Sequence, residues 1–166
     1  MNIKSSTHNT IILLLTILLG LLGGCSTTTR YRYSPSAAHA HSAILHSEVV
    51  VLARELLGTP YHYGGHSPRQ GFDCSGLVYY VHQEAGLHLP RTSYGQFKAT
   101  RPVGLHHLRP GDLVFFRISR YKISHVGIYI GHHQFIHAPS SGKDVSIDDL
   151  TDPYWRRHFV RGGRTL

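Results

Sequence analysis

Two hydrophobic periods follow one another along this chain, and their order limits the folds open to it. Apolar residues recur at helical spacing from His46 to Leu57 and again from Cys74 to Gly86. After Gly111 the sequence favours strands: GDLVFFRIS is rich in β-branched and aromatic residues, SHVGIYIG alternates with a period of two, and HQFIHA follows it across a turn. Because the helices come first and the strands follow, the sequence predicts an α+β fold, with N-terminal helices packed on an antiparallel β-sheet.

The helix boundaries carry local signals. Ser47 is expected to cap the first helix and Gly58 to end it, and Pro60 prevents its continuation. Asp73 is the expected N-cap of the second helix. The buried stripe of that second helix is predicted to consist of Leu77, Val78, Val81 and Ala85.

The N-terminus has the pattern of an export signal. A largely apolar run, Ile11 to Leu22, is too short to span the ~30 Å of a bilayer as a helix but is typical of a secretory signal. The small residues of LGGC then precede Cys25, whose thiol could be acylated. We therefore predict a lipoprotein signal; the alternative is a plain secretory signal with an incidental cysteine.

These observations divide the chain into three parts. Residues 1–24 are the predicted signal peptide, residues 25–45 the lipidated Cys25 with a flexible tether, and residues 46–166 the folded domain. Ser26 follows the predicted lipidated cysteine, which resembles the outer-membrane sorting signal of a Gram-negative cell. We expect an outer-membrane lipoprotein that faces the periplasm and meets the membrane through its lipid.

The chain carries a net charge of +8, which favours anionic partners. Export disfavours nucleic acid, and no basic cluster is interleaved with aromatic residues as a nucleic-acid platform would need. The fifteen histidines are scattered rather than spaced as metal ligands, so neither a metal nor a cofactor is expected. Most of them, His82 and His88 included, are expected at the surface.

Acylation of Cys25 would leave Cys74 as the only thiol. Cys74 lies at the predicted start of a helix, where unpaired N–H groups and the positive end of the dipole lower a thiol pKa and create a nucleophile. Ser75 and Gly76 keep the surroundings small, and nearby backbone N–H groups could hold an oxyanion. The alternative is a buried structural cysteine.

A thiolate needs an imidazole partner, and a predicted hairpin supplies two. His125 begins one of its strands and His137 ends the other. If Gly131 is the tip of an odd-membered loop, the two histidines lie opposite each other; if His132 and His133 form a two-residue turn, the pairing shifts and a bulge is needed. In either case His125 could face Cys74 as the base, with His137 orienting it.

The segments PYHYGG, GFDCSG, LPRTSYGQ, RPGDLVFF, HVGIYIG and FIHA, in this order, resemble the NlpC family of papain-like cysteine peptidases, and in particular its murein endopeptidase lipoproteins. The resemblance implies a papain-like domain that hydrolyses peptidoglycan stem peptides. It places the nucleophile on Cys74, the base on His125 and the orienting residue on His137. It also places an oxyanion contact on Tyr61, whose other interpretation is aromatic packing, and substrate contacts on Asp73 and Ser75.

The bond that is cut stays open between D-Ala–diaminopimelate cross-links and D-glutamyl–diaminopimelate bonds within a stem. Two other functions were weighed. A thiol amidase or acyltransferase could use the same fold, and a catalytically inert lipoprotein could bind the wall. The complete set of Cys74, His125 and His137 argues against the inert protein.

Overall fold

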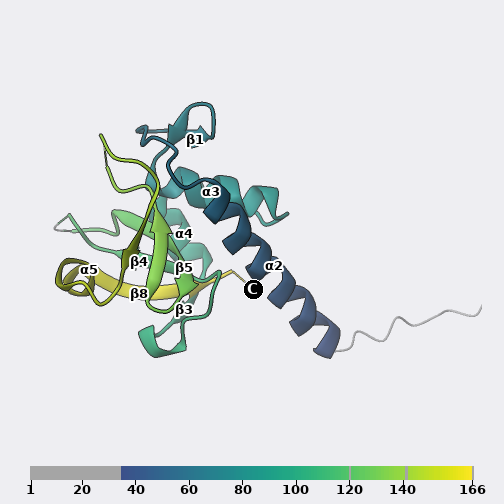
Figure 1. Ribbon diagram of the computed structural model, residues 1–166. Helices are drawn as coiled ribbons and strands as arrows, with labels where there is room; N and C mark the ends of the chain where they lie inside the picture. Colours follow the sequence, from purple (N-terminus) through teal and green to yellow (C-terminus); the bar gives the residue numbers. More distant parts are fainter. Residues whose placement is uncertain (1–34, 120, 141, 166) are drawn as a thin grey trace, which may run out of the picture. The chain divides into compact units, whose positions relative to one another are not determined.

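The computed structural model describes residues 35–119, 121–140 and 142–165 (Figure 1). The predicted signal peptide, Cys25 and the first part of the predicted tether lie outside this range. Within the described residues, none of the helices combines the length and the apolar character that a membrane crossing requires.

The helices are α2 (Pro35–Glu55), α3 (Cys74–Glu84), α4 (Ser93–Ala99), the 3-10 turn η1 (Leu105–His107) and α5 (Pro153–His158). The strands are β1 (His66–Ser67), β2 (Gly71–Phe72), β3 (Arg101–Val103), β4 (Leu113–Phe116), β5 (His125–Gly131), β6 (Gln134–His137), β7 (Ser146–Asp149) and β8 (Phe159–Arg164).

Helix α2 begins earlier than the sequence pattern predicted. The helix starts at Pro35, so residues 35–45, assigned to the flexible tether, are helical instead. The segment PSAAHAHSAIL contains four alanines, and alanine has the highest helix propensity. Such a segment can extend an existing helix without an apolar stripe, which is the signal that the sequence pattern relies on. Proline is also well suited to a first helical turn. The core-facing part of α2 buries Val49 and Ala53.

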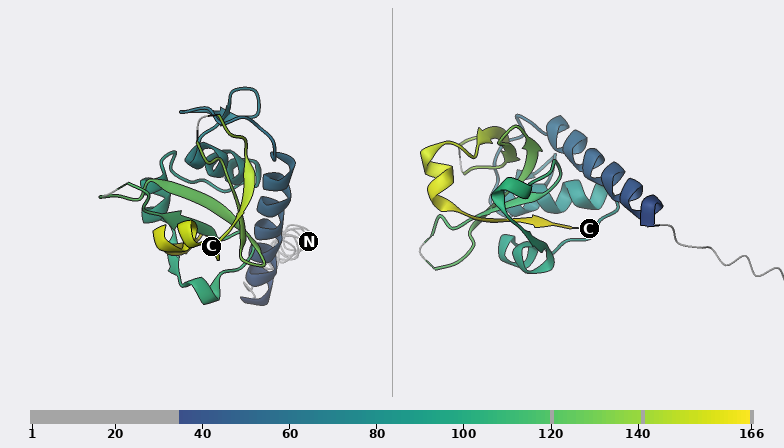
Figure 2. Two further views of the ribbon diagram at one scale, coloured as in Figure 1. Left: turned by 60° about the vertical axis from the view of Figure 1, so that its left-hand side comes forward. Right: turned by 90° about the horizontal axis from the view of Figure 1, so that it is seen from below.

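Six of the strands form one antiparallel sheet in the order β3-β8-β4-β5-β6-β7. Helices α2 and α3 cover one face, and α5 lies on the opposite side (Figure 2). The two faces bury separate clusters. The helix side contains Leu77, Val81, Phe115, Val126, Ile128 and Ile136, and the α5 side contains Val114, Phe116, Tyr129, Phe135, Leu150 and Trp155. The predicted α+β fold with helices on an antiparallel sheet is confirmed.

The hairpin of β5 and β6 follows the second of the two predicted registers. His132 and His133 form its two-residue turn, both with positive φ (51° and 62°), as a tight hairpin turn of this kind requires. A bulge follows, and Ile128 then pairs with Ile136. Continuing this register places Gly127 across from His137, so His125 is a diagonal neighbour of His137 on the same face.

The stripe predicted for α3 is confirmed, since Leu77, Val78, Val81 and Ala85 are all buried. The expectation that His82 lies at the surface is wrong, because its side chain is fully buried. Its Nδ1 is 2.9 Å from the carbonyl oxygen of Val78 one turn earlier, and its Nε2 has no hydrogen-bond partner among the described residues. Burial, first, and His46 as a neighbour lower the pKa of His82 to about 4.

Candidate active site

Cys74 is the first residue of α3, and its side chain is half-buried. Asp73 before it has extended backbone geometry, and its Oδ1 accepts a 2.7 Å hydrogen bond from the N–H of Gly76. This is the predicted N-cap, which satisfies one of the donors that a helix start leaves unpaired. A local interaction between neighbouring residues therefore decides where the helix begins and where its cysteine is presented.

The expected lowering of the Cys74 pKa is wrong for the free protein. Burial, first, and the adjacent Asp73 carboxylate raise the pKa of the Cys74 thiol to about 11. Backbone hydrogen bonds from Val126, Ser75 and Cys74 itself act in the opposite direction and do not compensate. The resting protein therefore holds a neutral thiol, and a neighbouring base must take its proton when the sulfur reacts.

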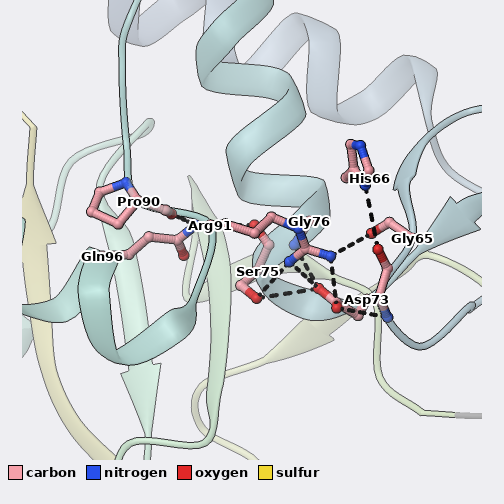
Figure 3. A network of polar contacts seen from close by, with 9 residues as sticks. Gly65, His66, Asp73, Ser75, Gly76, Pro90, Arg91 and Gln96 are labelled. Atoms are coloured by element: carbon pink, nitrogen blue, oxygen red, sulfur yellow. Dashed lines mark hydrogen bonds and ion pairs between the residues drawn. The ribbon is translucent and has the colours of Figure 1, made fainter.

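Asp73 is the centre of a polar network at the start of α3 (Figure 3). Its two oxygens accept from Arg91 Nη1 at 2.9 Å and Nη2 at 2.8 Å, and Oδ2 also accepts from the N–H of Gly64 at 3.0 Å. Arg91 donates further to the Ser75 hydroxyl at 3.1 Å and to the Gly65 carbonyl at 3.0 Å. Hydrogen bonds, which outweigh burial, hold the pKa of Asp73 below its usual value.

This network gives Asp73 and Ser75 a structural role. Both bond to Arg91 and to each other, with Ser75 Oγ 3.2 Å from Asp73 Oδ1. Their contact with the substrate, which the family resemblance implies, stays a prediction. The network ties the Gly64–Gly65 turn and the loop that carries Arg91 to the residue before Cys74. Gly76 is required at this junction, because a Cβ there would overlap the Gly65 carbonyl oxygen.

Tyr61 lies at the same end of α3. Its pKa is raised by burial, first, and then by the negative forms of Cys74 and Asp73, so both groups act on Tyr61 electrostatically. The Tyr61 N–H donates to the Lys143 carbonyl at 2.9 Å, which holds the Tyr61 segment against the loop between β6 and β7. The ring also packs against the core on the helix side of the sheet. Tyr61 thus combines the two roles that the sequence left open, aromatic packing and a position near the thiol.

The two histidines of the hairpin are in direct contact. His125 Nε2 lies 2.8 Å from His137 Nδ1, and both side chains are buried, with 3% and 0% of their surface exposed. Gly127 makes this approach possible, because a Cβ there would lie 2.6 Å from Phe135 Cδ2 and 3.3 Å from His137 Cβ. The predicted pairing of His125 with His137 on one face is confirmed.

Two residues that the sequence analysis did not single out continue this chain of contacts. His137 Nε2 lies 3.0 Å from Asp148 Oδ2, and Trp155 Nε1 donates to the same oxygen at 2.9 Å. The Trp155 ring stacks on His125 with a centroid distance of 5.4 Å and an interplanar angle of 27°. The antiparallel pairing of β7 with β6 brings Asp148 to His137.

The thiol and the histidine pair meet at the N-terminal end of β5. The backbone of Val126 hydrogen-bonds the Cys74 sulfur, and Val126 directly follows His125. Burial and, next, His137 lower the pKa of His125 to about 3, while the charge of Asp148 acts in the opposite direction. His125 is thus a neutral imidazole at physiological pH, able to accept a proton.

A cysteine at a helix start and a buried histidine pair on an antiparallel sheet are the features of a papain-like α+β domain. The match to a family model agrees with this class. Residues 58–164 match the model of the NlpC/P60 family, so the chain belongs to that family.

Curated relatives share most of this chain. Murein DD-endopeptidase MepH of Escherichia coli is 39% identical over 140 residues, which is 80% of this chain and 52% of the relative. The gamma-DL-glutamyl hydrolase of Bacillus subtilis is 46% identical over 111 residues, which is 65% of this chain and 26% of the relative. The chain therefore spans about half or less of the length of these proteins.

Solved structures agree with the fold. An NlpC/P60 family protein from Bacillus cereus superposes with a TM-score of 0.69 at 32% identity, over 73% of this chain and 40% of that one. The P60 domain of an antigen from M. avium subspecies paratuberculosis superposes with a TM-score of 0.65 at 27% identity, over 76% of this chain and 98% of that one.

Proposed function

We propose that the protein is a lipid-anchored peptidoglycan endopeptidase that hydrolyses stem-peptide amide bonds with Cys74, His125 and His137. One observation carries the proposal: the buried His125 is bonded to His137, and the Val126 backbone next to His125 in the chain acts on the Cys74 thiol as a hydrogen-bond partner. The names of the relatives, a murein endopeptidase and a gamma-DL-glutamyl hydrolase, support this substrate class.

The proposed reaction begins with a neutral thiol and a neutral imidazole. As the Cys74 sulfur bonds to the amide carbonyl carbon, its proton moves to His125, and the carbonyl oxygen takes up negative charge. Backbone N–H groups at the start of α3 and the Tyr61 hydroxyl stabilise that charge. The carbon–nitrogen bond then breaks, and His125 gives its proton to the leaving amine. His125 then takes a proton from water, and the resulting hydroxide attacks the thioester carbonyl carbon. As the carbon–sulfur bond breaks, His125 returns the proton to the sulfur.

The bond within the wall is proposed more coarsely, as either the D-Ala–diaminopimelate cross-link or the D-glutamyl–diaminopimelate bond. The names of the two relatives, a murein DD-endopeptidase and a gamma-DL-glutamyl hydrolase, differ in the bond that they give, which supports keeping both alternatives. Mass spectrometry of the products from a cross-linked muropeptide dimer and an uncross-linked monomer separates the two. Release of monomers from the dimer identifies the cross-link as the substrate, whereas shortened stems from the monomer identify the other bond.

Anchoring and location are further parts of the proposal. Cys25 is proposed to be acylated, and Ser26 after it supports an outer-membrane position that faces the periplasm. Labelling of cells with a palmitate analogue tests the modification, with Cys25→Ala as the unlabelled control. Recovery of the wild type in the inner-membrane fraction would refute the outer-membrane location.

The activity itself is tested by Cys74→Ala on purified peptidoglycan. Cleavage should fall by about 10³-fold or more, because nucleophile and base act as a unit. Arg69→Ala, an exposed change in the neighbouring loop, is the matched control and should leave the rate near that of the wild type. Near-full activity of Cys74→Ala would refute the mechanism.

A further inference from the structure

We infer that Asp148 is a positioning residue of this site, which fixes the proton on His137 Nε2 and thereby leaves Nδ1 of His125 as the atom that accepts the Cys74 proton. The inference rests on the proposed peptidase function. It is carried by three contacts in series. Asp148 Oδ2 lies 3.0 Å from His137 Nε2, His137 Nδ1 lies 2.8 Å from His125 Nε2, and Trp155 Nε1 donates to Asp148 Oδ2 at 2.9 Å.

The first contact decides where His137 carries its proton. Hydrogen bonding to His137, first, lowers the pKa of Asp148, so at neutral pH this carboxylate only accepts hydrogen bonds. The Trp155 hydrogen bond and the charge of Lys143 lower it further. A neutral imidazole has one N–H, and the contact with Asp148 requires that N–H on Nε2 of His137. Nδ1 of His137 therefore carries a lone pair and no proton.

The second contact then decides the tautomer of His125. Because Nδ1 of His137 can only accept, the proton between the two rings belongs to Nε2 of His125. A neutral His125 consequently has a bare Nδ1. When the thiol proton arrives there, His125 becomes an imidazolium whose Nε2–H still bonds to His137. Asp148 favours that charge at a distance, and the stacked Trp155 ring favours it through its π face.

The size of the effect follows from exposure. The Asp148 side chain is 41% exposed, so its charge is partly screened, whereas His137 is fully buried. Loss of an orienting partner of this kind should lower turnover by about 10- to 100-fold rather than abolish it. The Michaelis constant should change little, because Asp148 acts on the proton transfer and not on the substrate.

The test compares Asp148→Ala and Asp148→Asn with Asp149→Asn in the full chain, purified in detergent. Asp149 is the matched control, since its side chain bonds to Thr151 and the substitution removes the same charge one residue away. With a purified muropeptide dimer, Asp148→Ala should lose about 10- to 100-fold in kcat, and Asp148→Asn less, because its amide oxygen can still accept from His137. Equal losses in Asp148→Asn and Asp149→Asn, or a kcat for Asp148→Ala within twofold of the wild type, would overturn the inference.

Two further measurements distinguish a role of Asp148 in proton transfer from a purely structural role. Removal of the Asp148 charge should shift both limbs of the pH–kcat profile to lower pH, because a nearby carboxylate raises the pKa of imidazole and thiol alike. Nitrogen NMR of ¹⁵N-histidine-labelled protein should show a protonated Nε2 and a bare Nδ1 on both rings, with the His137 pattern altered in Asp148→Ala. A protonated Nδ1 on His137 in the wild type, or an unchanged pattern in the variant, would refute the assignment.

The NMR readout also separates this inference from the proposed function. If the wild type cleaves neither muropeptide, the peptidase proposal fails, while the protonation state of the two rings still decides the role of Asp148. Conversely, if the wild type cleaves the dimer but Nδ1 of His137 is protonated, the peptidase proposal holds and the proposed role of Asp148 fails.

Discussion

The buried His82 makes a quantitative prediction about acid stability. In the folded protein burial lowers the His82 pKa from 6.5 to about 4, and in the unfolded chain the imidazole is back in water. The unfolded state therefore binds more protons between these two pH values, so stability is highest above pH 6.5 and is lost as the pH falls toward 4. The difference of about 2.5 pKa units corresponds to about 3 kcal/mol at pH 4.

The variant His82→Leu removes the titrating imidazole and, with it, the buried Nε2 atom that has no hydrogen-bond partner among the described residues. The lost hydrogen bond to Val78 costs little, because that carbonyl is an i−4 acceptor within the same helix. We expect the free energy of unfolding of His82→Leu, relative to the wild type, to rise by about 3 kcal/mol between pH 7 and pH 4. The low pKa of His125 contributes in both proteins and cancels in the difference.

Urea unfolding at pH 7, 6, 5 and 4, followed by the fluorescence of the single tryptophan, Trp155, measures this difference. His106→Leu makes the same change at an exposed histidine and should follow the wild-type curve. A wild-type-minus-His82→Leu difference that stays constant within about 1 kcal/mol from pH 7 to pH 4 would refute the reasoning.

Two other substitutions test the close approach of the backbone beside the histidine pair and a buried ion pair elsewhere in the domain. Gly127→Ala would place a Cβ 2.9 Å from the Ile136 carbonyl oxygen, so we expect a loss of about 1–3 kcal/mol in urea unfolding and reduced muropeptide turnover as the His pair separates; wild-type values of both would contradict the close-approach argument. Arg164→Met should cost about 3–5 kcal/mol, because the Asp112 side chain that it pairs with at 2.6 Å is fully buried, and adding Asp112→Asn should recover part of the loss. No recovery in the double variant would show that the uncompensated charge is not the cause.

Local signals in the sequence were sufficient for the start of α3 and for the fold class. Asp73 caps the helix through a bond to Gly76 only three residues away, and such a contact needs no tertiary structure to form. The strand-rich second half likewise predicted an antiparallel sheet, because β-branched and aromatic residues favour strands and two such runs joined by a short turn form a hairpin.

The hairpin register needed the folded chain. His132 and His133 both adopt positive φ, a conformation for which histidine is an uncommon choice, so the sequence could only offer two alternatives. The extension of α2 through residues 35–45 was missed for a related reason, since a polar, alanine-rich segment has helix propensity without a hydrophobic stripe.

The chemistry of the site divides along the same line. The sequence by itself determined that a cysteine begins a helix and that two histidines share a hairpin, because caps and turns are interactions between neighbours. Only the tertiary structure decided the sign of the Cys74 pKa shift, the burial of His82 and the contact of Asp148 with His137. Burial depends on segments far apart in the chain, and no local pattern encodes which of them will exclude water from a given side chain. The contact of Asp148 with His137 depends in turn on the register in which β7 pairs with β6.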